Sequence, residues 1–166
     1  MPELKKISHA AIPHAIQKAE RYRLLNQSWA TESICLDVLE VDPANQQVIV
    51  MLILALTDQF GAEPKELAHR ARRLLDRVTD PYQRAYYAGI VGERLGHAQL
   101  ATTAMHAEAL AHESLSAAMA HFEQAERLRP PGNDDAILRW NTCARTLERL
   151  RTPEADEVAY EPIFGE

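Results

Sequence analysis

The chain has 166 residues, 46% hydrophobic and 25% charged, a balance that indicates one globular domain and excludes a disordered chain. The formal net charge of −6 gives no general attraction to nucleic acid or to an anionic membrane, and we expect neither as a partner. Cys35 and Cys143 are too few for a disulfide framework, and the longest apolar run, Val48 to Leu56, is too short to cross a bilayer. The first residues lack the apolar stretch of a signal peptide, so we expect a cytoplasmic protein.

Prolines and helix-capping residues divide the chain into segments of about seventeen residues. Pro13, Pro64 and Pro81 each open a segment, and the first turn of a helix tolerates proline because its amide needs no partner there. Asn45 and Asp80 are suited to cap the helices that follow them. We expect helices to begin near residues 13, 29, 45, 64, 81 and 133.

The run from Val48 to Leu56 is rich in valine and isoleucine and fits either a buried strand or a buried helix. Its apolar character continues to Phe60, and no second strand-like segment is present to pair with it. We therefore expect a helix of about four turns, covered by neighbours on every side because it is apolar all round.

Gly89 and Gly92 fall within the segment that begins at Pro81. A glycine inside a helix costs about 1 kcal/mol relative to alanine, so a compensating role is expected. Small residues let two helix backbones approach closely, and these glycines therefore predict a close helix crossing.

Residues 98–129 contain neither glycine nor proline and carry one apolar stripe at helical spacing. The stripe consists of Leu100, Ala104, Ala107, Ala111, Ser114, Ala118, Phe122, Ala125 and Leu128. We favour a single unusually long helix over 98–129, about 48 Å in length. The alternative is a break near His112 to Leu115 with Ser114 as N-cap. A single helix of this length would extend beyond a normal hairpin. This overhang is a candidate homodimer surface, because the chain has no lysine or arginine between Arg94 and Arg127.

Helices of this length joined by short turns predict stacked antiparallel hairpins. Ala118-x3-Phe122-x2-Ala125-x4-Pro130 resembles the second helix of a tetratricopeptide repeat and the proline that ends it, and a similar spacing is found in Thr31-x3-Cys35-x2-Val38-x4-Pro43. The first-helix pattern of the same family is similar to Trp140-x2-Cys143-Ala144-x2-Leu147 and to Ala15-x2-Lys18-Ala19-x2-Tyr22. The resemblance implies an all-α solenoid of about three and a half hairpins over residues 12–150. An N-terminal extension, 1–11, and an acidic C-terminal tail, 151–166, flank it.

The resemblance also implies a function. Tetratricopeptide repeats bind a peptide or helix of a partner protein in a concave groove lined by the first helix of each hairpin, without catalysis or cofactor. The side chains that map to such a groove are Ile16, Glu20, Tyr86, Ile90, Arg94, Asn141, Arg145 and Arg149. For any one of them, an ordinary surface position is an equally good interpretation.

A different class of function would use the 98–129 segment. Met105, His112 and Met119 are spaced seven residues apart. His106 is adjacent to Met105, and Glu108 precedes His112 by four residues. Side chains of these types bind metal ions, so the alternative function is a small helical metal-binding protein or enzyme. Positions seven apart lie about 10 Å apart along a helix, too far for one ion to bridge. The chain also lacks a phosphate-binding loop and a nucleophile elbow. We therefore expect no metal site and no catalysis.

Lys65 to Arg84 carries six basic and three acidic side chains. We favour a solvated helix face with ion pairs to Glu66, Asp76 and Asp80. The alternative is a site for an acidic partner, because arginine binds carboxylates with two parallel hydrogen bonds.

The segment from Thr152 onward has five acids and no bases. Its large apolar residues are Val158, Tyr160, Ile163 and Phe164. Besides a flexible tail, two functional interpretations compete. The segment docks over the exposed end of the 133–150 helix, which we favour, or it occupies a groove.

Overall fold

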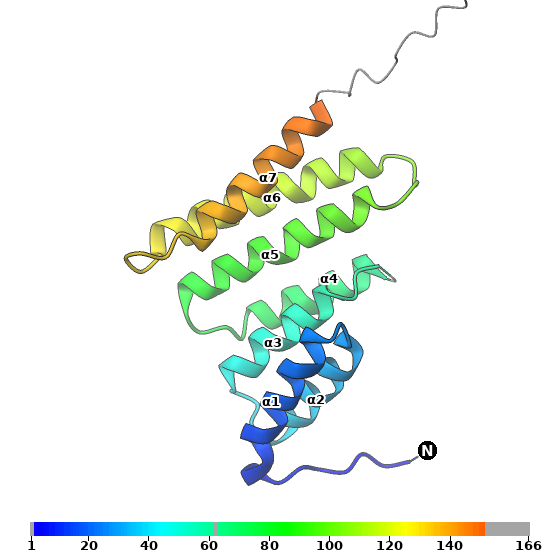
Figure 1. The fold of residues 1–166 in the computed structure, drawn as a ribbon, viewed down its shortest axis with the longest axis vertical. Helices are drawn as coiled ribbons and strands as arrows, with labels where there is room; N and C mark the ends of the chain where they lie inside the picture. The colour runs from blue at the N-terminus through cyan, green and yellow to red at the C-terminus, as the bar shows by residue number, and fades with distance from the viewer. Residues whose placement is uncertain (1, 62, 152–166) are drawn as a thin grey trace, which may run out of the picture.

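A computed structural model describes residues 2–61 and 63–151, and over these residues the protein is all-helical with no strand (Figure 1). A 3-10 turn, His9–Ala11, precedes seven α-helices. Their bounds are α1 Ile12–Leu24, α2 Ser28–Val41, α3 Gln46–Thr57, α4 Pro64–Leu75, α5 Pro81–Leu100, α6 Ala107–Leu128 and α7 Asp135–Arg151.

Each helix packs against the next one in the chain, from α1 with α2 through to α6 with α7. In addition, α1 contacts α3 and α3 contacts α5, so odd-numbered helices lie beside one another under the even-numbered ones. This arrangement confirms the expected all-α fold with sequentially packed helices. The tetratricopeptide character of the stack remains a prediction.

The helix starts follow from local chemistry as expected. The side chain of Asn45 accepts a hydrogen bond from the amide of Val48 at 3.1 Å, and that of Asp80 from the amide of Gln83 at 2.7 Å. These bonds satisfy amides that have no partner within the first turn. Prolines stand in the first turn of α1, α4 and α5.

Helix α3 is the centre of a large apolar cluster that α1, α2, α4 and α5 complete. Ile49, Ile53 and Leu56 of α3 are at most 1% exposed, so the helical interpretation of the Val48–Leu56 run is correct. Val50 and Leu54 are only half-buried, so α3 is not covered on every side. A second cluster joins α5, α6 and α7 around Phe122.

The single helix predicted over 98–129 is wrong. Helix α5 ends at Leu100, α6 begins at Ala107, and the chain reverses between them, with His106 in the left-handed conformation at φ 67°. The alternative break near His112 to Leu115 is also wrong, because these residues lie within α6. The chain turns back so that α6 packs against α5. This tertiary packing outweighs the helical spacing of apolar residues in the segment between the two helices.

The predicted stripe nevertheless faces the interior from Ala107 to Ala125, whereas Leu128 is 45% exposed. Helices α5 and α6 contain 20 and 22 residues, so α6 does not extend far beyond its partner. The homodimer surface predicted on an overhang therefore loses its structural basis.

The close helix crossing predicted from Gly89 and Gly92 is found between α5 and α6. A Cβ atom on Gly89 would lie 2.4 Å from the ring of Phe122, and one on Gly92 would lie 3.1 Å from Cβ of Ala118. Gly96 makes a third approach of this kind, with Leu115. The three glycines lie at intervals of three and four residues and give α5 a flat side against α6.

Gly89→Ala should destabilise the protein by about 1–3 kcal/mol, because the added methyl group meets the ring of Phe122, which is 0% exposed and cannot move aside. Chemical denaturation measures the effect. The matched control is Gly61→Ala, where nothing lies within 4 Å of the added carbon and a change within about 0.5 kcal/mol is expected. Equal stability of the two variants would show that the crossing is looser than these distances indicate.

Candidate binding surfaces

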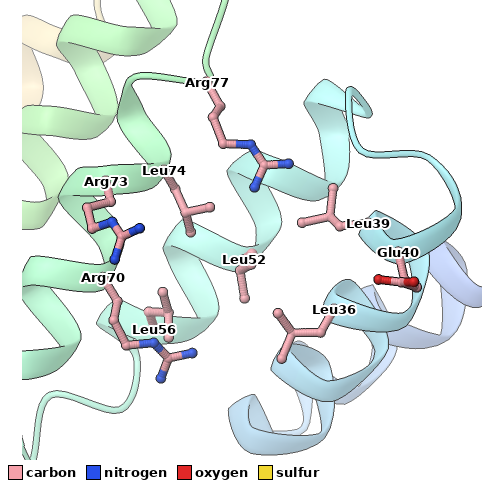
Figure 2. A pocket seen from close by; sticks show the side chains of 9 residues that line it. All are labelled: Leu36, Leu39, Glu40, Leu52, Leu56, Arg70, Arg73, Leu74 and Arg77. Atoms are coloured by element: carbon pink, nitrogen blue, oxygen red, sulfur yellow. The ribbon is translucent and has the colours of Figure 1, made fainter. Parts of the chain in front are cut away.

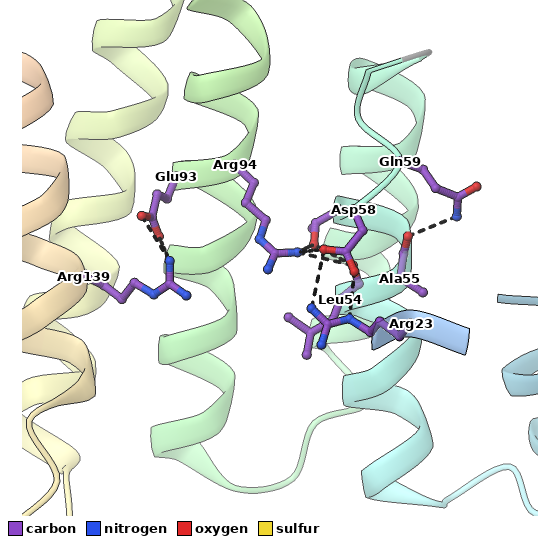
Figure 3. Close-up of polar contacts among 9 residues, drawn as sticks. Arg23, Leu54, Ala55, Asp58, Gln59, Glu93, Arg94 and Arg139 are labelled. Carbon is purple, nitrogen blue, oxygen red and sulfur yellow. Dashed lines mark hydrogen bonds and ion pairs between the residues drawn. The ribbon is translucent and has the colours of Figure 1, made fainter. Parts of the chain in front are cut away.

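Three odd-numbered helices bring together a cluster of charges centred on Asp58, which directly follows α3 (Figure 3). Nε of Arg23 in α1 donates to the Asp58 carboxylate at 2.7 Å, and Arg94 in α5 donates to the same carboxylate. Arg94 also donates to the hydroxyl of Thr57 at 2.6 Å. Burial lowers the pKa of Arg94, and Asp58 opposes that shift. Asp58 therefore joins α1, α3 and α5 on one face, which we call the odd-helix face.

A second ion pair ties α7 to α5. The side chain of Glu93 is only 3% exposed, and both its oxygens lie 3.4 Å from Nη1 of Arg139 (Figure 3). Burial lowers the pKa of Arg139, but Glu93 and the neighbouring Tyr86 more than offset this, so the net shift is upward. A carboxylate this deep needs its partner, because an unpaired buried charge is strongly destabilising.

The predicted groove residues are distributed unevenly. Glu20 is exposed on α1 and accepts a hydrogen bond from Gln47 of α3 at 3.0 Å. Together with Arg23 and Leu54 it lines a hollow of about 370 Å³ between α1 and α3. Arg94 belongs to the Asp58 cluster on the same face.

The remaining candidates do not extend this hollow. Ile16 and Ile90 are 8% and 2% exposed and belong to the two apolar clusters, so their side chains are not on a surface. Asn141 is half-buried in α7, and Arg145 and Arg149 are exposed on the same helix. The family spacing could not distinguish the helix face that points into the core.

A larger groove lies on the opposite, even-helix side, between α2 and α4 and above α3 (Figure 2). We call it the leucine–arginine groove. Its volume is about 410 Å³. Its lining residues are Leu36, Leu39, Glu40, Leu52, Leu56, Arg70, Arg73, Leu74 and Arg77.

The wall of the groove formed by α4 and the residues after it is positively charged. The arginines Arg70, Arg73 and Arg77 are spaced three and four residues apart and project along one edge (Figure 2). Arg70 pairs across the groove end with Glu32 of α2, and Arg77 donates to the carbonyl of Pro43 at 2.6 Å. Within the described residues, Arg73 has no carboxylate at ion-pair distance.

The ion pairs expected within the basic segment are absent from the described part of the chain. Neither Glu66 nor Asp76 pairs with an arginine there, and Asp80 caps α5. The acid on the facing wall of the groove, Glu40, pairs with Lys6 at 3.0 Å. On this wall, Arg73 and Arg77 therefore have no carboxylate partner within the described residues, whereas Arg70 is paired with Glu32. The spacing of the arginines was visible in the sequence, but the leucines of α2 and α3 that complete the groove were not.

The predicted methionine–histidine face is not formed as a unit. Met105, which is 83% exposed, and His106 lie in the turn before α6, whereas His112 and Met119 lie within the helix. Over the residues that the structure describes, no group of three or more histidine, cysteine, aspartate or glutamate side chains is placed to hold a metal ion.

Comparisons of this chain with protein-family models, with curated proteins and with solved structures gave no significant match. Over its described length, the protein has no helix with both the length and the apolar character needed to span a membrane. The indications of function therefore come from the geometry of the two surfaces.

Both thiols should be unreactive in the folded protein. Cys35 and Cys143 are at most 1% exposed, and burial, with a smaller effect of nearby carboxylates, raises the pKa of each to about 12. At pH 8 the thiolate would then be about one part in ten thousand. Dithionitrobenzoate should modify neither cysteine in native protein and both in guanidinium chloride, and rapid modification of native protein would contradict the burial.

Asp58→Asn should lower the free energy of unfolding by about 1–3 kcal/mol, because Arg23 and Arg94 would then face each other without a carboxylate. Urea denaturation of the two proteins measures this. Glu20→Gln neutralises an exposed acid on the same odd-helix face and should change stability by less than about 0.5 kcal/mol. A loss of the same size in both variants would assign the effect to net charge and not to the cluster.

Proposed function

We propose that the protein is a non-catalytic protein-binding module and that its leucine–arginine groove holds an acidic, amphipathic segment of a partner protein. The observation that carries the proposal is the combination of a leucine floor with a row of arginines that have few carboxylates of their own. Each half of this combination selects one property of the bound segment.

The floor selects apolar side chains. Leu36 is 48% exposed at the mouth of the groove, while Leu52 and Leu56 of α3 form its base at 3% and 1% exposure. Burying a large apolar side chain in such a site contributes about 1.5–3 kcal/mol. Two or three of them give an anchor of the kind that dominates protein interfaces.

The arginine wall selects acidic side chains and fixes their positions. Arg70, Arg73 and Arg77 repeat at the spacing of helix turns, so a partner helix lying along α4 would present its acids at the same intervals. Arginine suits this role because its planar guanidinium group binds a carboxylate through two hydrogen bonds. Glu40 on the facing wall disfavours a segment that is acidic on both edges.

The odd-helix face is the weaker candidate for this function. Its arginines, Arg23 and Arg94, already donate to Asp58, so binding a partner carboxylate there would require breaking internal bonds. The arginines of the leucine–arginine groove do not share this constraint to the same degree, since Arg73 has no such partner within the described residues. The two cysteines are buried, and no metal-holding cluster of three or more acids, histidines or cysteines is found in the described part of the chain.

Selection from a random peptide library tests the proposal and requires no identified partner. Enriched peptides should combine leucine, isoleucine or phenylalanine with aspartate or glutamate and bind with roughly micromolar affinity. Arg73→Glu combined with Arg77→Glu should weaken their binding by about tenfold or more, because attraction is replaced by repulsion at the wall.

The matched control is Arg127→Glu, which reverses one exposed arginine on α6, away from the groove, and should leave peptide affinity within about twofold. Peptides that bind the double variant as tightly as the unmodified protein would reject the groove as the binding site. Enrichment of neutral or basic sequences would reject the acidic partner.

A further inference from the structure

We infer that the leucine–arginine groove accepts the acidic C-terminal segment, residues 152–166, of a second copy of this chain. The inference rests on the proposed function and names a specific occupant for the same groove. It rests on the complementary chemistry of segment and groove, on the charge of the hollow near the end of α7, and on the reach of the segment within its own chain.

The chemistry of the segment matches that of the groove. Residues 152–166 contain five acids and no bases, and they include large apolar residues. The apolar residues, Val158, Tyr160, Ile163 and Phe164, follow closely on Glu154, Asp156 and Glu157. An acidic block beside an apolar block fits a groove whose wall is arginine and whose floor is leucine.

The hollow nearest the end of α7 differs from the leucine–arginine groove in its charge. It lies between α6 and α7, has a volume of about 640 Å³ and is lined by Met119, Ala144, Leu147, Glu148 and Arg151. Its single acid and single base give an acidic segment no net attraction, whereas three arginines line the leucine–arginine groove.

The sequence favours docking of the segment over the 133–150 helix. The segment itself lies outside the described residues, so its docking on α7 is not tested. The charge of the two surfaces is the reason to favour the leucine–arginine groove, because the hollow beside α7 has one acid and one base in its lining.

The reach of the chain keeps the apolar block as a whole out of the groove of its own chain. Helix α5 lies between α4 and α7, so the axes of α4 and α7 are about two interaxial distances apart, or about 16–20 Å. The groove opens on the side of α4 that faces α2 (Figure 2), a further helix diameter of about 10 Å. Residues 152–157, which precede the apolar block, span at most about 20 Å when fully extended. A segment from a second copy has no such limit.

Docking of this kind makes the protein associate head to tail, because tail and groove are different surfaces of the same chain. The association should depend on concentration, and it should weaken as salt screens the attraction between the acids and the arginine wall. Sedimentation velocity of the full chain at low and high salt measures both dependences.

The decisive experiment is a charge exchange in the full chain. Arg73→Glu with Arg77→Glu reverses the groove, and Glu154→Arg with Glu157→Arg reverses the tail. Each pair alone should lower the association constant by about tenfold or more, and the two pairs combined should restore it to within about threefold. The control, Arg145→Glu with Arg149→Glu, reverses exposed arginines on α7 and should leave association unchanged. Circular dichroism should show the same helix content for all variants.

Several outcomes would overturn the inference. A full chain that stays monomeric at high concentration and low salt would do so, as would loss of association in the α7 variant but not in the groove variant. Failure of the combined variant to recover would show that tail and groove do not meet. If library peptides still bind the groove in any of these cases, only the assignment of the tail is wrong. Loss of peptide binding as well would reject the proposed function itself.

Discussion

The fold depends on the burial of α3, an apolar helix that four neighbours cover on most of its sides. Helices α1, α2, α4 and α5 all contribute to the cluster around Ile49, Ile53 and Leu56. Helices α2 and α4 both pack on α3, and Leu52 and Leu56 of α3 line the floor of the groove between them. The long aliphatic stems of arginine cover such a floor while their charged groups remain in water. The leucine–arginine groove is therefore a direct consequence of how α3 is buried.

Arginine has two different roles in this protein, and the distance to a carboxylate decides which one applies. On the odd-helix face, Arg23 and Arg94 share Asp58, and Arg139 reaches the buried Glu93, so these guanidinium groups join helices that are distant in sequence. On the even-helix side, Arg73 has no acid in reach among the described residues. The arginines of the odd-helix face therefore all hold helices together, whereas on the even-helix side Arg70 does so through Glu32 and Arg73 has no carboxylate partner among the described residues.

Features that depend on local chemistry could be predicted from the sequence, and features that depend on packing could not. Asn45 caps its helix with its own side chain, and Gly89 marks a crossing because an interior glycine needs compensation. The turn over residues 101–106 contains neither glycine nor proline, so the sequence does not indicate that a helix ends there. A repeat motif gives the position of a residue along a helix but not what packs against it, so Ile16 and Ile90 were assigned to a groove although neighbouring helices bury them. The leucine–arginine groove combines residues of α2, α3 and α4, and no single segment carries its pattern.

The distribution of charge along the chain connects these points. The formal charge of the whole chain is −6, and the five acids of residues 152–166 account for −5, so residues 1–151 carry only −1. The helical body is therefore close to neutral, and the acidity of the protein is mainly a property of its C-terminal segment. In a nearly neutral body, Arg73 and Arg77, which have no carboxylate partner among the described residues, leave positive charge on this wall, whereas Arg70 is paired with Glu32. The overall charge thus conceals the local row of arginines on which the proposed binding of an acidic segment rests.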